Sequence, residues 1–596
     1  MMNLLEGVLI MSYRPDNPLM IQSDMTVLFE VDHPDAPQIR NVLGDFAELE
    51  KSPEHVYTYR MTPLSLWNAA SAGRTLDQIL NLFKKYSKFA VAPNVIQEIR
   101  DQFQRFGLLR LEKENDRLYL SSREPSVLAD IFRFKSMHSF IKGQIGSNRV
   151  EVHAHARGRL KQELIKIGYP VQDVAGYTDG APLQFSLRQA TIGGEPFALR
   201  PYQTEAVDSF YQSGSSQGGN GVLVLPCGAG KTVIGIAAAA AVGAETLILC
   251  SSVTAARQWI AEILDKTTIT DDQIGEYSGV RKAIRPITVA TYQIVSYRKS
   301  KDAGFDHLAL FAKRDWGLII YDEVQMLPAP VFRVTADIQA RRRLGLTATL
   351  IREDGLETDV FSLIGPKRYD VPWKELERSG WIATASCTEI RVALNDKERI
   401  AYAAAPKRGQ IRVAAEAADK LNIVRQLLEK HRGDQILIIG QYIDQLKRLQ
   451  QFIPVPLITG HTSMKKRDEL YGQFRSGAIS CLIVSKVANF AIDLPDANVA
   501  IQISGQFGSR QEEAQRLGRI LRPKARGVQA SFYSVVTKNT REQEFAMKRQ
   551  RFLTEQGYEY HIVEAEEIGR APELSLRPGI VSLAEYRHKK QKEGGL

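Results

Sequence analysis

The sequence predicts an α/β protein whose larger part consists of two tandem domains with parallel sheets. Two series of short, almost continuously apolar runs indicate this, because each series alternates with helical segments. The first series contains "GVLVL", "TLILC", "ITVA", "GLIIY" and "LGL" between Gly221 and Leu346, and the second contains "QILII", "CLIVS", "VAIQIS" and "SFYSVV" between Gln435 and Val536. Strands that are apolar on both faces are typical of parallel sheets covered by helices on each side. A chain of 596 residues is also too long for a single core.

Smaller α+β units are expected before Leu199. Helices are predicted to begin at Pro63, after a capping box at Thr75–Gln78, and at Pro93, and the alternating runs "LLRLE" and "RLYLS" follow them. Three helices and a hairpin suggest a winged-helix-like unit. The stretch "VEVHAHARGRLKQELIKIGYP" predicts a strand and an amphipathic helix in a second small domain. We therefore divide the chain into residues 1–125, 130–192, 196–375, 376–555 and a tail at 556–596.

Composition restricts the class of protein and its partners. The net charge of +10 and the pI near 9.2 fit a polyanionic partner. The four cysteines form no CxxC pair, which favours a reduced, cytoplasmic compartment and argues against an iron–sulfur cluster. The apolar start lacks the basic region and cleavage site of a signal peptide, and the longest apolar stretch, "VIGIAAAAAVGA", is too short to span a bilayer. We expect no membrane association.

A phosphate-binding loop is predicted at "LPCGAGKT", because this segment follows a strand and opens a helix. Backbone N–H groups of such a loop can face a phosphate, Lys231 can reach the β- and γ-phosphates, and Thr232 can hold Mg²⁺. The match is partial, since Leu225 replaces the first glycine of the full pattern. A glycine turn with a surface lysine is the simpler alternative. The expected nucleotide-binding residues of the loop are Cys227, Gly228, Ala229, Gly230, Lys231 and Thr232.

Two adjacent carboxylates end the apolar run of "LIIYDEVQ". Asp322 can coordinate Mg²⁺, and Glu323 can activate the attacking water. An Asp-Glu pair is usually a solvated loop, but its position after a buried strand and downstream of a phosphate loop favours catalysis. ATP and Mg²⁺ are therefore the expected cofactors, with Thr232 and Asp322 as metal ligands.

A third candidate element is the helix predicted at "EEAQRLGRILR", which carries arginines three residues apart and Gln515. A solvated charged face is the simpler interpretation of a lone helix. However, Arg519 and Arg522 on the second parallel-sheet domain suit bidentate contact with a γ-phosphate bound on the first. Such a shared site would close with ATP and open after hydrolysis.

In this order the motifs resemble those of superfamily 2 helicases and translocases, which have two RecA-like domains. That resemblance implies that Gln203 in "LRPYQTEAV" reads adenine, with Arg200 beside it, and that Asp493 in "SKVANFAIDLP" contacts the ribose. Thr347 and Thr349 correspond to the motif that links the ATP site to the nucleic acid.

The segments "WGLIIYDEVQMLPAPVFR", "LGLTATLIRED", "DVFSLIGPKRY" and "GSRQEEAQRLGRILR" together resemble the XPB DNA helicases. In that family an Arg-Glu-Asp triplet acts in DNA unwinding, and here it corresponds to Arg352, Glu353 and Asp354. The resemblance also implies an N-terminal XPB-type domain, a damage-recognition-like domain and a thumb-like insertion near residues 395–420. Gln325 departs from the family, which commonly has His there, and this questions the strength of coupling more than the ATPase.

The resemblance implies an ATP-dependent 3′-to-5′ DNA helicase or double-strand DNA translocase in DNA repair, acting on duplex, forked or damaged DNA. Archaeal relatives pair with a nuclease, so a repair nuclease is a candidate partner, and we expect a monomer. Two alternatives stay open. One is another superfamily 2 enzyme: a translocase without robust unwinding, an RNA helicase, against which "LIRED" argues, or a restriction-type translocase, against which the lack of a nuclease motif argues. The other is a DNA-damage-binding ATP switch, against which the intact Lys231, Glu323, Arg519 and Arg522 argue.

Overall fold

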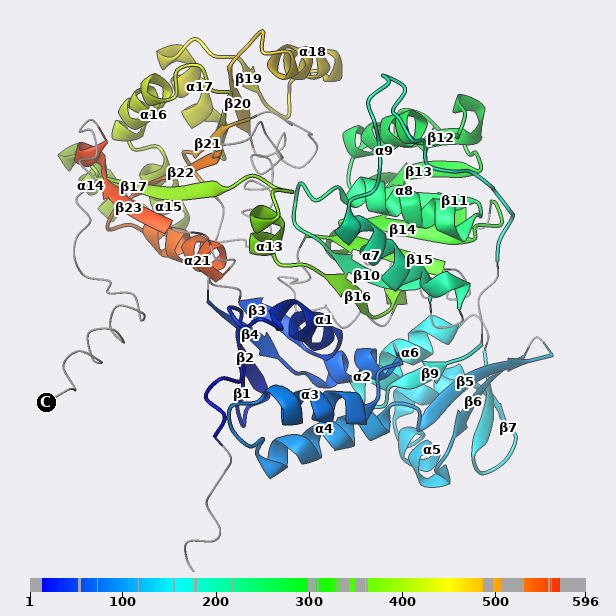
Figure 1. Ribbon diagram of the computed structural model, residues 1–596. Coiled ribbons are helices and arrows are strands. Elements are labelled where there is room, and N and C mark those ends of the chain that lie inside the picture. The colour runs from blue at the N-terminus through cyan, green and yellow to red at the C-terminus, as the bar shows by residue number, and fades with distance from the viewer. Residues whose placement is uncertain are drawn as a thin grey trace, which may run out of the picture.

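The computed structural model describes most of the chain between residues 13 and 568. The described residues are 13–51, 55–71, 73–115, 117–153, 156–175, 179–215, 218–297, 307, 310–311, 313–327, 331, 342–348, 360, 363–485, 497–505, 530–555, 558 and 560–568. Figure 1 shows four units: a small N-terminal unit in blue, a second small unit in cyan, and two larger parallel-sheet domains in green and in yellow to red.

The first parallel sheet has the strand order β12-β13-β11-β14-β15-β10-β16, and all neighbouring strands in it pair in parallel. Its strands are β10 (Asn220–Val224), β11 (Thr246–Cys250), β12 (Ile274–Tyr277), β13 (Ile287–Thr291), β14 (Leu318–Asp322), β15 (Arg342–Thr347) and β16 (Lys367–Asp370). Along β14, Leu318 and Ile320 enter one core, and Ile319 and Tyr321 enter another. Both faces of the sheet are therefore buried, as the continuous apolar runs predict.

Helices cover the two faces of this sheet. One face packs against α7 (Pro201–Tyr211), α8 (Lys231–Val242) and α9 (Val253–Lys266), and the other against α10 (Tyr292–Val295). Parallel strands direct their carboxyl ends to one edge of a sheet, where ligands of α/β proteins bind. The loop after β10 and the carboxylates at the end of β14 therefore lie at the same edge.

The second parallel sheet has the order β19-β20-β18-β21-β22-β17-β23. Its strands are β17 (Ala385–Val392), β18 (Ile436–Gly440), β19 (Leu457–Ile458), β20 (Cys481–Ser485), β21 (Val499–Gln502), β22 (Ala530–Thr537) and β23 (Tyr560–Glu564), and its helices include α16 (Asp419–Lys430), α17 (Ile443–Phe452), α18 (Met464–Arg475) and α21 (Arg541–Glu555). The prediction of two tandem α/β domains is confirmed. The sequence did not predict β12, β16, β17, β19 or β23, which are short or partly polar.

The N-terminal unit combines an antiparallel sheet of order β1-β2-β4-β3 with helices. Its elements are β1 (Leu19–Ile21), β2 (Thr26–Glu30), α1 (Ala36–Phe46), β3 (Glu48–Lys51), β4 (Val56–Arg60), α2 (Pro63–Ser71), α3 (Leu76–Tyr86) and α4 (Pro93–Arg105). The predicted capping box is present: the Gln78 amide donates to Thr75 Oγ1 at 3.2 Å, and the Thr75 amide donates to Gln78 Oε1 at 3.0 Å. The three helices begin where the sequence places them.

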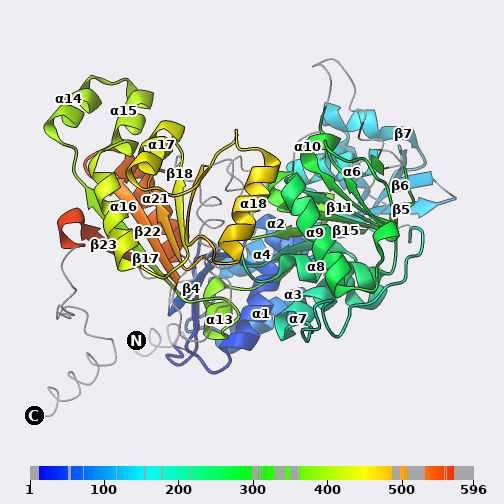
Figure 2. The same ribbon diagram turned by 90° about the horizontal axis from the view of Figure 1, so that it is seen from above.

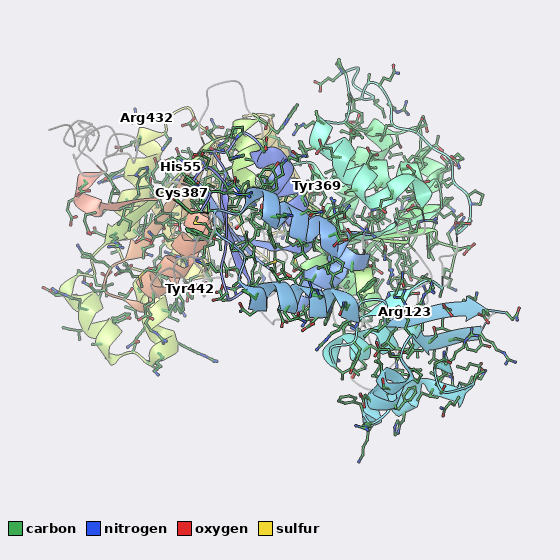
Figure 3. All side chains as sticks on the ribbon, turned by 60° about the horizontal axis from the view of Figure 1, so that its bottom comes forward. His55, Arg123, Tyr369, Cys387, Arg432 and Tyr442 are labelled. Carbon is green, nitrogen blue, oxygen red and sulfur yellow. The ribbon has the colours of Figure 1, made fainter. Side chains whose placement is uncertain are left out.

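The predicted hairpin is present as β5 (Leu109–Glu114) and β6 (Arg117–Ser122). It pairs with strands of the second small unit in the order β7-β8-β6-β5-β9. The other elements are α5 (Pro125–Ile131), β7 (Ile141–Gln144), β8 (Arg149–Val152), α6 (Arg157–Lys166) and β9 (Val171–Asp173). This sheet extends across residues 125–130, and the hairpin packs in a core separate from that of the N-terminal helices, while the division of the chain into domains stays a prediction. In Figure 3, Arg123 lies on this unit, far from Cys387, Arg432 and Tyr442 of the second parallel-sheet domain.

The segment that joins the two parallel sheets contains α13 (Trp373–Arg378). Figures 1 and 2 both show α13 between the two large domains and close to α1 of the N-terminal unit. An ion pair between Arg40 of α1 and Glu375 of α13 fixes this contact, with Arg40 Nη2 2.6 Å from Glu375 Oε1. Near it, Lys367 Nζ donates to the carbonyl of Ala47 at 3.4 Å. The N-terminal unit therefore holds the joining segment.

Two helices, α14 (Asp396–Ala404) and α15 (Lys407–Ala415), occupy the position of the expected thumb-like insertion. They form a pair before α16, and their role stays a prediction. Across the described ranges, we find no helix with the length and apolar character needed to span a membrane.

A buried ion pair anchors α16 within the second large domain. Lys420 is 1% exposed, and its ammonium donates to both oxygens of Glu542 at 2.7 and 2.8 Å and to the carbonyls of Ile503 and Val535. Glu542 also accepts a hydrogen bond from the Thr537 amide at 3.0 Å. Burial lowers the pKa of Lys420, and the Glu542 carboxylate opposes this effect. The pair ties α16, β22, α21 and the residue that follows β21 together.

We expect Lys420→Met to destabilise the second large domain locally by about 3 kcal/mol, because it leaves the Glu542 carboxylate buried without a counter-charge. Hydrogen exchange of the amides of β22 and α21 in the full chain would measure the change. The control is Lys466→Met, which removes an exposed ion pair with Glu469. If both variants exchange alike, the buried pair does not stabilise this domain.

Candidate functional site

The loop between β10 and α8 has the backbone geometry of a phosphate cradle. Gly228 and Gly230 have φ angles of +84° and +76°, a region that glycine enters without strain. A Cβ on Gly230 would also lie only 2.6 Å from Gln203 Nε2. Leu225 is fully buried in the core, and its amide donates to the Thr347 carbonyl at 2.9 Å. Leu225 therefore packs in the core at the position where the full pattern has a glycine.

The first residue of α8, Lys231, meets the carboxylate of Glu323, which directly follows β14 in the middle of the sheet. Lys231 Nζ lies 3.4 Å from Glu323 Oε1, and the two side chains are 12% and 18% exposed. Burial opposes the charge on Lys231, but the carboxylates of Glu323 and Asp322 outweigh this effect and raise the pKa of Lys231. The cation is therefore retained in a buried position at a helix N-terminus, which suits an anionic ligand.

Asp322 is held in place by aromatic residues that the sequence did not single out. The indole N–H of Trp259 in α9 donates to Asp322 Oδ2 at 3.0 Å, and the Tyr292 hydroxyl donates to the Asp322 carbonyl at 2.9 Å. Burial and the neighbouring Glu323 carboxylate raise the pKa of Asp322 to about 6. A bound cation would favour the ionised form of this carboxyl, so the site fits a divalent metal ion.

Glu323 adopts a left-handed backbone conformation with a φ of +49°, which is uncommon for a non-glycine residue. Its side chain takes part in a continuous chain of hydrogen bonds. Gln325 Nε2 donates to Glu323 Oε2 at 2.6 Å, and Thr347 Oγ1 donates to Gln325 Oε1 at 2.5 Å. Gln325, which departs from the family pattern, therefore bridges the Glu323 carboxylate and the Thr347 hydroxyl through its amide nitrogen and its amide oxygen.

The side of the loop away from the carboxylates is lined by α7. Gln203 is 4% exposed, and its Nε2 donates to the Ala229 carbonyl at 3.2 Å while its Oε1 accepts from the Arg200 amide at 3.0 Å. The Tyr202 hydroxyl donates to the same Ala229 carbonyl at 2.7 Å. The structure thus brings Gln203 and Arg200 next to the phosphate loop, as the sequence predicts for a base-binding side.

Most of the predicted residues on the first large domain lie around this loop. Cys227, Gly228 and Ala229 are in the loop, and Thr232 is the second residue of α8. Thr347 is the last residue of β15 and takes part in the chain of hydrogen bonds. Several other predicted residues lie outside the described part of the chain: Thr349, Arg352, Glu353, Asp354, Asp493, Gln515, Arg519 and Arg522.

This arrangement can bind a phosphate chain at a helix N-terminus, neutralise it with Lys231 and place a carboxylate next to it. The Thr232 hydroxyl and the Asp322 carboxylate are oxygen ligands of the kind that Mg²⁺ prefers, and Mg²⁺ needs few protein ligands when phosphates supply others. Trp259 and Tyr292 would be difficult to find from the sequence, because an aromatic residue at a helical or strand-end position usually belongs to the core.

Comparison with known proteins shows similarity to helicases. Residues 376–577 match the ERCC3/RAD25/XPB C-terminal helicase family, residues 19–145 match a helicase conserved C-terminal domain, and residues 196–352 match the res subunit of type III restriction enzymes. The "DNA 3'-5' helicase XPB" of Kineococcus radiotolerans is 52% identical over 95% of this chain and 100% of its own length.

Two further relatives agree. The protein of the same name from Mycobacterium tuberculosis is 52% identical over 93% of this chain and 99% of its own length. The general transcription and DNA repair factor IIH helicase/translocase subunit XPB/SSL2 of Saccharomyces cerevisiae is 30% identical over 92% of this chain and 73% of its own length. With half of all positions identical to two bacterial relatives over almost the whole length of each, this chain belongs to the XPB helicase family.

Proposed function

We propose that the protein is an ATP-dependent 3′-to-5′ DNA helicase or double-strand DNA translocase that acts in DNA repair of the nucleotide-excision type. The observation that carries this proposal is the chain Lys231–Glu323–Gln325–Thr347, which runs from the phosphate loop to the motif that faces the nucleic acid in superfamily 2. The names of the bacterial relatives support the 3′-to-5′ polarity and the DNA substrate. The yeast relative's name supports a repair role.

The chain's own residues divide the work of ATP hydrolysis. Thr232 and Asp322 would hold Mg²⁺, which neutralises phosphate charge when bound. Lys231 supplies a fixed positive charge at the start of α8, and Trp259 fixes one oxygen of Asp322. Glu323 is the proposed base, since its carboxylate lies at the end of β14 and is oriented by Lys231 and Gln325. Gln203 and Arg200 bind the base of the nucleotide.

The second large domain completes the site in this proposal. Arg519 and Arg522 act as γ-phosphate contacts, Gln515 belongs to the same sequence motif, and Asp493 binds the ribose. The order of these motifs along the chain supports the assignment, together with the tandem arrangement of the two parallel sheets. Closure of the two domains around ATP, and their opening after hydrolysis, would then move them along DNA.

DNA, in duplex, forked or damaged form, is the proposed partner. The excess of positive charge supports contact with the phosphate backbone. In this proposal Arg352 pairs with a phosphate at the fork, while the carboxylates of Glu353 and Asp354 repel a strand that approaches wrongly.

We expect Lys231→Ala to abolish ATP turnover and weaken nucleotide binding, because the counter-charge to the phosphates is lost. Glu323→Gln should retain nucleotide binding and lose hydrolysis, since the base is removed. Steady-state ATPase assays with forked DNA, combined with nucleotide-binding titrations, would measure both effects. Turnover like that of the unmodified protein in either variant would remove the assignment of the site. Binding of ATP and DNA by the unmodified protein without turnover would favour the ATP-switch alternative.

Gln325→Met should reduce the stimulation of ATPase by duplex DNA by at least about fivefold, because the loss of two buried hydrogen bonds of this kind is worth ~1 kcal/mol or more. Its DNA-independent ATPase should change less. Gln325→His is the matched control, since imidazole can also donate and accept a hydrogen bond. Equal stimulation of the Met variant and the unmodified protein would show that the bridge does not couple the sites.

Replacing Arg352, Glu353 and Asp354 together by Ala should leave DNA-independent ATPase near the original rate and sharply reduce strand displacement on forked DNA. The physical reason is that the triplet would act at the fork, outside the ATP site. Lys231→Ala is the control, because it should lose both activities. If the triple variant unwinds as fast as the unmodified protein, the triplet is a solvated charged turn.

A further inference from the structure

A tryptophan from the segment between the two sheets lies on the base side of the phosphate loop. Trp381 follows α13 and precedes β17, and its amide donates to the Leu376 carbonyl at 2.8 Å. Its side chain is half-buried against the core that also contains Tyr202 and Ala229. The position of Trp381 is therefore fixed by α13 on one side and by the first large domain on the other.

The contacts of Trp381 are with Arg200 and Tyr202. The Arg200 guanidinium lies over the indole ring at 4.9 Å from the centroid, and Arg200 Nη1 donates to the Trp381 carbonyl at 3.4 Å. The same Nη1 donates to the Tyr202 hydroxyl at 3.2 Å, and the Tyr202 and Trp381 ring centroids are 6.2 Å apart. Two hydrogen bonds and one ring face thus determine how the guanidinium plane is oriented.

This orientation matters because Arg200 and Gln203 are adjacent on the same turn. The Arg200 amide donates to Gln203 Oε1, and Gln203 Nε2 donates to the loop carbonyl of Ala229. A planar guanidinium stacks on flat aromatic groups with either face. One face lies over Trp381, so the other can stack on a flat heterocycle that is bound beside Gln203.

We propose that Trp381 is a positioning residue for the nucleotide base: it holds the Arg200 guanidinium flat against its indole, so that Arg200 stacks on a purine next to Gln203. The proposal rests on the proposed function of the phosphate loop as an ATP site. It adds that base recognition uses a residue from the segment leading into the second sheet, so the stack joins the first large domain to this segment. Purines are favoured over pyrimidines because they cover more of the guanidinium.

Calorimetric titration of the full-length protein with Mg²⁺ and ADP, CDP or inorganic tripolyphosphate tests this idea. Trp381→Ala should weaken ADP binding on the order of tenfold, since stacking on a guanidinium contributes about that much. Its preference for ADP over CDP should fall, and tripolyphosphate, which has no base, should bind as it does to the unmodified protein. Trp381→Phe should restore most of the ADP affinity, because it keeps a ring for the guanidinium.

Steady-state hydrolysis provides a second measurement. Trp381→Ala should raise the KM for ATP about tenfold and change kcat less, because base positioning is a binding effect. The matched control is Trp373→Phe in the same segment. Trp373 packs against Tyr558, with ring centroids 6.3 Å apart, whereas the Arg200 guanidinium lies over Trp381. It should leave nucleotide affinity unchanged.

The outcomes separate the two proposals. Unchanged ADP affinity in Trp381→Ala, or equal loss of ADP and tripolyphosphate binding, overturns the role of Trp381. Equal effects of Trp373→Phe and Trp381→Ala also overturn it, because they indicate a general disturbance of the segment. Failure of the unmodified protein to bind either ADP or tripolyphosphate contradicts the nucleotide site itself. Selective loss of ADP binding, with rescue by Phe, supports the proposal.

Discussion

The buried positive charge of Lys231 is the constraint on which the site depends. An ammonium at this depth needs a counter-charge, and Glu323 supplies it at 3.4 Å. Glu323 can reach Lys231 because it follows β14, which is separated from the strand before the phosphate loop by β15 alone. A ligand anion that neutralised Lys231 would leave Glu323 held by Gln325, whose other hydrogen bond is with Thr347. Charge balance at one lysine therefore connects ligand binding to the end of β15.

The segment between the two sheets carries a second set of constraints. Arg40 of the N-terminal unit binds Glu375, Arg200 of the first large domain lies over Trp381, and Lys374 lies 4.9 Å from the Tyr558 ring centroid near the end of the second. Three units of the protein thus contact one short stretch of chain, from Lys374 to Trp381, which is fewer than ten residues long. Movement of one large domain relative to the other must change at least one of these contacts. The N-terminal unit is consequently connected to the segment that links the two large domains.

The sequence allowed the two parallel sheets and the core of the site to be predicted, because apolar runs and the glycine-lysine loop are local patterns. It did not reveal that β5 and β6 pair with β8 and β9, since periodicity identifies a strand but not its partner. Trp259 and Trp381 were missed for a related reason. Each meets its polar partner only because the order of strands and the path after α13 bring distant segments together. The division of the chain into domains and the roles of residues such as Arg519 stay predictions.

Gln325 illustrates how a departure from a family pattern can preserve a connection. The bridge needs one donor toward Glu323 and one acceptor toward Thr347 at the same time. A primary amide provides both at every physiological pH, whereas histidine provides both only when neutral and in the correct tautomer. Protonated histidine would keep the bond to the carboxylate but lose the acceptor for the Thr347 hydroxyl. The glutamine therefore makes the link between Glu323 and Thr347 independent of pH in the range where histidine titrates, so its presence need not weaken the coupling of the two sites.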